Sequence, residues 1–514
     1  MRMTSPKRRF IPMKSVSEKT VNEEKEEEWS NTTLNITRQS NDKSQENHHD
    51  DNQFSSEEAL TQISVSPSTL SYTKGCTIPI TSFLRIIAPK DEIPNGIWPI
   101  FRILDENGVI RNPANDGYRI SNKKKFTVDT SNQRKPEAFN DDLIALREFL
   151  SLNYSWLNFD QNPLLKPATY PYSDTESTNT LIRAYTHMIR LRHMDTILQH
   201  IQRQGRISFY MTCHGEEATT IGAAVALDLD DVILAQYREA GALMWRGFTS
   251  QQFADQCFSN QGDLGKGRQM PIHYGSRALN YQTISSPLGT QLPQAVGAAY
   301  RLKLQKKANV AIVFFGDGCA SSCDFHSACN FASTLNVPVI FLCRNNGYAI
   351  STPTTEQYAG DGIISRCRGY GMAGLRVDGN DLLAVCAAVQ AAKEYALANS
   401  SPVMIEAMTY RQGHHSTSDD STRYRDHREV QTVTETMDPM VRLGAFLTQY
   451  GILDGDDSIR LSDSEKQEIL QAIHIAETKG KPTLDNLFED VYKEKPLHLQ
   501  RQEQQLNEHI QAVK

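Results

Sequence analysis

Two polar motifs follow two apolar segments in the middle of this 514-residue chain. The apolar run at 309–315 leads directly to Gly-Asp-Gly at 316–318, and the run at 337–343 leads to Asn-Asn at 345–346. Each run is typical of a strand buried on both faces of a parallel sheet. The glycines let the backbone turn sharply beside a ligand. Since the carboxyl ends of parallel strands share one edge of the sheet, a carboxylate and an amide are expected to meet there.

The types of these side chains favour a magnesium ion that holds a diphosphate. Mg²⁺ prefers oxygen ligands, and a carboxylate, an amide oxygen and a main-chain carbonyl leave positions for phosphate oxygens and water. A helix is predicted at 324–335, whose first N–H groups suit an anion at the same edge. The alternative is an ordinary strand-helix-strand unit with a glycine-rich turn. No G-x-G-x-x-G motif is present, which disfavours a nicotinamide cofactor, and the motif is similar to that of thiamine diphosphate enzymes.

The composition excludes several classes of function. A net charge of −7 over the whole chain provides no basic surface for nucleic acid. No apolar stretch approaches the length of about 18 residues that would indicate a membrane helix. The nine cysteines include no paired C-x-x-C motifs, so they indicate neither a disulfide framework nor a zinc site and fit a reducing compartment. We therefore expect a small-molecule substrate, with no nucleic-acid or membrane partner.

The chain divides into four predicted segments. Residues 1–75 are rich in Ser, Asn, Glu, Lys and Gln, and they predict a disordered tail because they cannot bury enough apolar surface. Residues 76–175 form an N-terminal extension, in which 118–173 is an irregular insertion. Residues 176–440 form the principal domain, and 441–514 form a polar, helical C-terminal segment.

Alternating helices and strands predict the fold of the principal domain. Strands are expected at 232–235 and 403–407, in addition to the two runs above. A helix is expected to begin near residue 181, with capping candidates at 177–178. Its apolar face is formed by Leu181, Tyr185, Met188, Ile189, Ile197, Leu198 and Ile201. Such alternation is typical of an α/β fold with a doubly wound, mostly parallel sheet.

Seven further motifs, together with the Gly-Asp-Gly turn, resemble the alpha subunits of branched-chain 2-oxo acid dehydrogenases, a family of thiamine diphosphate-dependent decarboxylases. They lie at 205–218, 235–241, 264–275, 284–300, 344–352, 376–381 and 406–420. The related pyruvate dehydrogenase alpha subunits typically have Gly-His-Ser-Met-Ser where this chain has Gly-His-His-Ser-Thr-Ser at 413–418. That difference favours a branched-chain substrate. The resemblance covers roughly residue 77 to the C-terminus, apart from the insertion, and implies an α/β sheet of the thiamine diphosphate-binding type.

The resemblance also implies which residues would form the site. Mg²⁺ would be held by Asp317, Asn346 and Tyr348. Thiamine diphosphate would be lined by Gln236, Tyr237, Arg238, Ser286, Leu288, Gly318, Cys319, Arg344 and His415. A structural potassium ion would be held by Ser285, Pro287, Thr290 and Gln291. Arg238 and Arg344 would oppose the phosphates with forked donors. The alternative for both arginines is a surface ion pair.

The implied reaction is the decarboxylation of a branched 2-oxo acid and the passage of its acyl group to a lipoyl thiol on a separate acyltransferase core. His415 would donate a proton or orient the substrate carboxylate, although a His-His pair on a loop is often plain surface. Ser416 matches a position that is phosphorylated in this family, which implies a regulatory kinase and phosphatase, because added negative charge beside the cofactor would disorder the loop.

A second subunit is expected, because this chain has no second α/β repeat to supply the carboxylate that activates the cofactor ring. The resemblance implies a beta subunit and an α₂β₂ tetramer. It also implies the mitochondrial matrix, and the first nineteen residues are basic and contain serine, as a transit peptide would.

Three positions depart from the pattern of the family. Ser322 and Cys323 stand where the family usually has Glu and Gly, and Asp317 replaces a Glu of close relatives. We expect the lost Glu to weaken cofactor orientation and Cys323 to strain a turn. Two alternatives to an active branched-chain subunit therefore remain. One is a subunit for pyruvate or another 2-oxo acid, and the other is a non-catalytic regulatory paralogue.

Overall fold

The structure, a computed structural model, describes residues 69–111 with short gaps, 180–449 and 452–513. Most of the predicted tail and the whole predicted insertion at 118–173 lie outside these residues, as do the capping candidates at 177–178. Ordered structure begins earlier than predicted, since Thr69–Thr73 of the predicted tail form strand β1. The other segment boundaries stay predictions.

Nine strands of the described residues form one sheet, in the order β1-β2-β3-β10-β11-β7-β6-β4-β5. Only the β1–β2 pair is antiparallel, and every other neighbouring pair is parallel. The strands are β1 (Thr69–Thr73), β2 (Cys76–Thr81), β3 (Ile100–Phe101), β4 (Val232–Leu234), β5 (Tyr281–Gln282), β6 (Ala311–Gly316), β7 (Val339–Asn345), β10 (Ala373–Asp378) and β11 (Val403–Met408). A separate hairpin consists of β8 (Tyr348–Ala349) and β9 (Thr352–Pro353).

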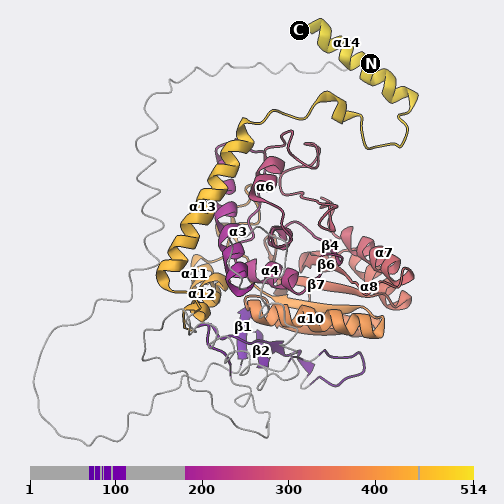
Figure 1. Cartoon of the computed structure of the whole chain (residues 1–514). Coiled ribbons are helices and arrows are strands. Elements are labelled where there is room, and N and C mark those ends of the chain that lie inside the picture. Colours follow the sequence, from indigo (N-terminus) through magenta and orange to yellow (C-terminus); the bar gives the residue numbers. More distant parts are fainter. Residues whose placement is uncertain are drawn as a thin grey trace, which may run out of the picture. The chain divides into compact units, whose positions relative to one another are not determined.

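The described residues also form α-helices, and Figure 1 labels the longer ones. They are α3 (Thr180–Arg203), α4 (Glu217–Val225), α5 (Ala240–Trp245), α6 (Ser250–Cys257), α7 (Gln291–Leu304), α8 (Cys323–Leu335), α9 (Thr354–Gln357), α10 (Leu382–Asn399), α11 (His427–Met437), α12 (Pro439–Gln449), α13 (Gly455–Thr478) and α14 (Leu497–Val513). The 3₁₀ turns are η4 (Gly318–Ser321), η5 (Ile364–Tyr370), η6 (Ser421–Arg423) and η7 (Leu484–Leu487). None of the helices within the described ranges is long and apolar enough to cross a membrane.

Alternate residues of strand β6 enter two different hydrophobic cores. Ile312 and Phe314 pack into the core that contains α3, α4 and α10. Ala311, Val313 and Phe315 pack into the core that contains α7 and α8. Since successive side chains of a strand point to opposite faces, helices cover both faces of the sheet. The predicted doubly wound, mostly parallel α/β sheet is confirmed.

The C-terminal segment is helical, as predicted, but it is not uniformly exposed. Helix α13 buries Ile469, Ala472, Ile473 and Ala476 and packs against α3 and α6. The face of α3 that was predicted from periodicity is buried throughout. Helix α14, by contrast, has no buried residue.

Candidate active site

The two predicted ligand-bearing motifs follow neighbouring strands at the same sheet edge. Strands β6 and β7 are paired with Gly316 opposite Arg344, so Asp317 and Asn346 each lie just beyond this pair. The amide of Gly316 donates to Oε1 of Gln236, at 2.7 Å, which ties the end of β6 to the segment that follows β4. The register of the parallel sheet therefore brings the two motifs together.

Asp317 carries a buried carboxylate without a basic partner. Its Oδ2 accepts a hydrogen bond from Nε2 of Gln357, at 2.6 Å. No lysine or arginine of the described ranges forms an ion pair with it. Burial raises the pKa of Asp317 to about 6, and the negative charge of Glu216 adds to this effect. A buried carboxylate of this kind would be stabilised by a cation.

Asn346 is anchored by its nitrogen. Its Nδ2 donates to Oε1 of Glu216 at 2.9 Å, while its Oδ1 accepts from the backbone N–H of Tyr348 at 3.3 Å. The side chain of Tyr348 points elsewhere, because its hydroxyl donates to Glu429 of α11 at 2.9 Å. We call Asp317, Asn346 and Tyr348 the clamp. Carboxylate, amide and carbonyl oxygens are a donor set that suits Mg²⁺.

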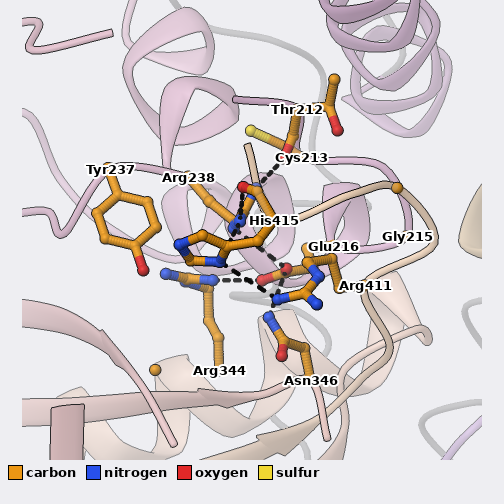
Figure 2. A network of polar contacts seen from close by, with 12 residues as sticks. Thr212, Cys213, Gly215, Glu216, Tyr237, Arg238, Arg344, Asn346, Arg411 and His415 are labelled. Carbon is orange, nitrogen blue, oxygen red and sulfur yellow. Dashed lines mark hydrogen bonds and ion pairs between the residues drawn. The ribbon is translucent and has the colours of Figure 1, made fainter. Parts of the chain in front are cut away.

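A buried network of arginines and glutamates lies beside the clamp (Figure 2). Arg344 donates to Glu239 and to Glu216, and Glu239 also accepts from the backbone N–H of Gln236 and Tyr237. The side chains of Arg344 and Arg238 are almost completely buried. The alternative of surface ion pairs for these two arginines is therefore wrong. Within the described residues, Nε and Nη1 of Arg344 have hydrogen-bond partners, and Nη2 would be available to a further partner.

His415 lies between two arginines, with its Nδ1 3.3 Å from Nη2 of Arg238 and 3.3 Å from Nη1 of Arg411. Because arginine can only donate, Nδ1 must accept, and the proton of the neutral ring lies on Nε2. Burial and the two arginines lower the pKa of His415 to about 3. The imidazole is therefore neutral near pH 7 and can donate a hydrogen bond from Nε2.

The other predicted cofactor residues differ in their degree of exposure. Ser286 is bonded to Nε2 of His273 at 2.7 Å, and Nδ1 of His273 contacts the carbonyl of Pro271 at 3.1 Å. Nδ1 of His273 therefore carries the proton, and Ser286 donates.

Tyr237 is half-buried with its ring edge-on to His415, with 6.2 Å between the ring centroids. Cys319 is buried, whereas Leu288 is exposed.

Gly318 has a structural role that the sequence did not reveal. A Cβ at this position would lie 2.6 Å from Cβ of Ala349. The glycine thus makes room for strand β8, in addition to any ligand.

Ser322 caps α8 by accepting from the backbone N–H of Phe325 at 3.4 Å. Cys323 is the first residue of that helix and has no positive φ, so the expectation that it strains a turn is wrong.

The predicted potassium residues form a compact loop. The hydroxyl of Thr290 is 3.1 Å from Oγ of Ser285 and 3.2 Å from the carbonyl of Pro287. Gln291 begins α7 and donates from Nε2 to the carbonyl of Phe314 in β6 at 3.2 Å. Three of the four residues thus gather their oxygens, and the fourth fixes the loop to the sheet.

Ser416 lies on the loop that carries His415. Asp419 of this loop accepts from the backbone N–H of His415 at 2.7 Å and from the hydroxyl of Tyr424 at 2.6 Å. Ser416 is half-buried, and its Oγ accepts from the backbone N–H of Ser418 at 3.3 Å. An added negative charge at Ser416 would therefore arise close to Asp419, which holds His415 in place.

Sequence reasoning missed four residues of the site: Glu216, Glu239, Arg411 and Gln357. Glu216 and Glu239 are completely buried and hold the two arginines that were predicted. Their signal in the sequence was a charged residue within two positions of a glycine, in Gly-Glu-Glu at 215–217 and Arg-Glu-Ala-Gly at 238–241. Charged residues are rarely buried without a partner, but Arg344, which both glutamates bind, lies more than a hundred residues away along the chain.

Comparison with known proteins agrees with this geometry. Residues 185–485 match the family described as dehydrogenase E1 component. Over 336 residues the chain is 53% identical to 2-oxoisovalerate dehydrogenase subunit alpha, mitochondrial, of Caenorhabditis elegans, and the match covers 65% of this chain and 78% of that protein. It is 49% identical over 352 residues to the human protein of the same name, covering 68% of this chain and 78% of the relative.

A plant relative gives the same result. The chain is 50% identical over 339 residues to 2-oxoisovalerate dehydrogenase subunit alpha 2, mitochondrial, of Arabidopsis thaliana, covering 65% of this chain and 72% of that protein. The residues that match the family, 185–485, include strands β4–β7, β10 and β11, the clamp and both predicted arginines. This chain therefore belongs to the dehydrogenase E1 component family.

Proposed function

We propose that this chain is the alpha subunit of a branched-chain 2-oxo acid dehydrogenase. This oxidoreductase decarboxylates 3-methyl-2-oxobutanoate and related acids and transfers the acyl group to a lipoyl carrier. The observation that carries the proposal is that Asp317 and Asn346 follow two paired strands at one sheet edge, in a chain about half identical to 2-oxoisovalerate dehydrogenase alpha subunits. The names of these relatives also support a mitochondrial location.

The donor set of the site fits thiamine diphosphate and Mg²⁺. Asp317 and Asn346 would bind the metal with their side chains and Tyr348 with its carbonyl, since the Tyr348 hydroxyl is bonded to Glu429. The buried, unpaired carboxylate of Asp317 supports a cation at this position. Arg238 and Arg344 would face the phosphates. When bound, thiamine diphosphate supplies the carbon nucleophile that decarboxylation of a 2-oxo acid requires.

The residues of this chain would bind and orient the substrate rather than attack it. His415 presents Nε2–H, fixed by the contacts of Nδ1 with Arg238 and Arg411, and this donor would hold the substrate carboxylate or a developing oxyanion. The loop of Ser285, Pro287, Thr290 and Gln291 would take a potassium ion.

This chain would act together with other proteins. A beta subunit would complete the site in an α₂β₂ tetramer, and a lipoyl-bearing acyltransferase core would accept the acyl group. A kinase and a phosphatase would act at Ser416.

The decisive experiment is co-expression with a beta subunit, followed by calorimetric titration of thiamine diphosphate with Mg²⁺ and a decarboxylation assay. Asp317→Ala is expected to abolish measurable cofactor binding, because it removes the only predicted carboxylate ligand. Undiminished affinity of this variant would refute the clamp.

Two other functions are separated by the same assay. Faster turnover of pyruvate than of 3-methyl-2-oxobutanoate would favour a pyruvate dehydrogenase subunit. Cofactor binding without turnover, or no binding, would favour a regulatory paralogue. That last option loses part of its support, because Ser322 caps a helix and Cys323 lies in regular helix.

A further inference from the structure

Glu216 is a buried carboxylate that belongs to none of the predicted sites, yet it faces the clamp. It immediately precedes helix α4 and is completely buried. Its Oε1 accepts from Nδ2 of Asn346 at 2.9 Å, and its Oε2 accepts from Nη1 of Arg344. Nε of Arg238 lies 3.9 Å from Oε1. One carboxylate therefore connects an expected metal ligand to both expected phosphate-binding arginines (Figure 2).

The contact with Glu216 decides which end of the Asn346 amide faces the clamp. An asparagine side chain has a donating nitrogen and an accepting oxygen, whereas an ionised carboxylate can only accept. The nitrogen must therefore face Glu216, and Oδ1 must point away from it. Oδ1 accepts from the backbone N–H of Tyr348 at 3.3 Å, and a carbonyl-type oxygen has a second lone pair for another partner.

We propose that Glu216 is a positioning residue for the divalent cation, which orients Asn346 so that its oxygen rather than its nitrogen faces the metal. Glu216 does not itself contact the metal. Residues that fix the orientation of a metal ligand typically change metal affinity by about 10-fold to 100-fold when they are replaced. This inference rests on the proposed function, because it requires Asn346 to be a ligand.

The variant Glu216→Gln tests the orientation directly. The glutamine that it introduces has only one accepting oxygen, and Arg344, as the charged donor, is expected to take it. The amide nitrogen of this glutamine would then face Asn346. The Asn346 side chain would turn its oxygen toward the glutamine nitrogen, and its own nitrogen would face the metal. We expect the dissociation constant of the metal to rise by about 10-fold to 100-fold.

The double variant Glu216→Gln with Asn346→Asp exchanges the carboxylate and the amide. The glutamine nitrogen can donate to one oxygen of the new aspartate, and the other oxygen faces the metal. The numbers of carboxylates and amides are unchanged, so the double variant also controls for a folding defect of the single one. The metal affinity of the double variant is expected to lie within about 3-fold of the wild type, whereas Glu216→Gln alone is expected to lose about 10-fold to 100-fold. Asn346→Asp alone sets two carboxylates against each other and is expected to bind the metal more weakly.

The measurement uses Mn²⁺ in place of Mg²⁺, in the complex with the beta subunit and with thiamine diphosphate present. The electron paramagnetic resonance signal of free Mn²⁺ reports binding without any turnover. The matched control is Glu217→Gln, because Glu217 is equally buried and adjacent but accepts from Arg192 and Gly215 instead. This control is expected to keep its Mn²⁺ affinity.

Several results would overturn the positioning role. Glu216→Gln could bind Mn²⁺ as tightly as the wild type, or the double variant could fail to recover its Mn²⁺ affinity. Glu217→Gln could lose as much Mn²⁺ affinity as Glu216→Gln. Asn346→Asp alone could bind Mn²⁺ more tightly, which would indicate a pure charge effect. Asp317→Ala in the same assay separates this failure from that of the proposed function. Loss of Mn²⁺ binding by Asp317→Ala together with unchanged binding by Glu216→Gln would remove only the positioning role, whereas retained binding by Asp317→Ala would remove the clamp itself.

Discussion

His415 shows how single residues of this site are defined by what surrounds them. The sequence predicted a residue that donates a proton or orients the substrate carboxylate near neutral pH, but the ring lies against two guanidinium groups that cannot accept a proton. Burial, Arg238 and Arg411 lower its pKa to about 3, and the charge of Asp419 opposes this only partly. The side chain is therefore a neutral hydrogen-bond donor over the physiological pH range.

This state of His415 predicts a pH profile. Between pH 5 and 8 the wild-type imidazole stays neutral, because the whole range lies above its pKa of about 3. Replacing His415 by Asn should lower kcat by about 10²-fold through loss of the donor, without changing the shape of the pH profile of kcat/KM. His414→Asn is the control, since His414 contacts Ser421 instead. The neutral state of His415 would be contradicted if the wild-type profile of kcat/KM changed slope near pH 6 to 7 and the His415→Asn variant lacked that change.

The loop that carries His415 is the element that the sequence described least well. Its conformation depends on Arg425, which is buried and donates to the carbonyl of Arg411, to the carbonyl of Gly413 at 2.7 Å and to Oγ of Ser421 at 3.0 Å. The guanidinium also lies over the rings of Tyr348, Tyr410 and Tyr424 at 5.5–6.0 Å from their centroids. One side chain thus links the loop to the clamp.

Replacing Arg425 by Ala should release this loop. Three carbonyl or hydroxyl acceptors would lose a charged donor, and we expect a loss of about 2–4 kcal/mol in the free energy that holds the loop closed. Chymotrypsin cleavage after Tyr424, followed by mass spectrometry, should become faster. Arg423→Ala is the matched control, because Arg423 is exposed and, among the described residues, forms an ion pair only with Asp420, at 3.5 Å. Equal cleavage of the two variants would contradict the role of Arg425.

At the scale of the whole molecule, one carboxylate joins distant parts of the described chain. Asp378, at the end of β10, is completely buried. Its Oδ2 accepts from Arg442 of α12 at 2.7 Å and lies 3.1 Å from Nε of Arg102. Burial opposes the ionised form, but Arg442 and Arg102 outweigh it and lower the pKa of Asp378 below its ordinary value.

Replacing Asp378 by Asn should therefore destabilise the entire fold. Two buried arginines would lose their common counter-charge, at a cost of about 3–5 kcal/mol. Because the pKa of the folded state is below the unfolded value of 3.8, this stabilisation is present above about pH 4 and is lost as the pH falls through the lower value. The difference in Tm between the two proteins should be large at pH 7 and shrink below pH 4. A difference that does not depend on pH would contradict this account.

The sequence by itself determined the sheet, the order of its central helices and strands, and the place where the clamp forms, because apolar periodicity and glycine turns are local signals. It failed for β10, where Arg376 interrupts the apolar pattern. That charge lies directly opposite Glu406 in the neighbouring strand β11 and pairs with it at 3.0 Å. Only the tertiary structure revealed this partner and, in the same way, the roles of Glu216 and Arg425. The cost of burying these charges is offset by groups that only the fold brings into contact with them, and no local pattern encodes those contacts.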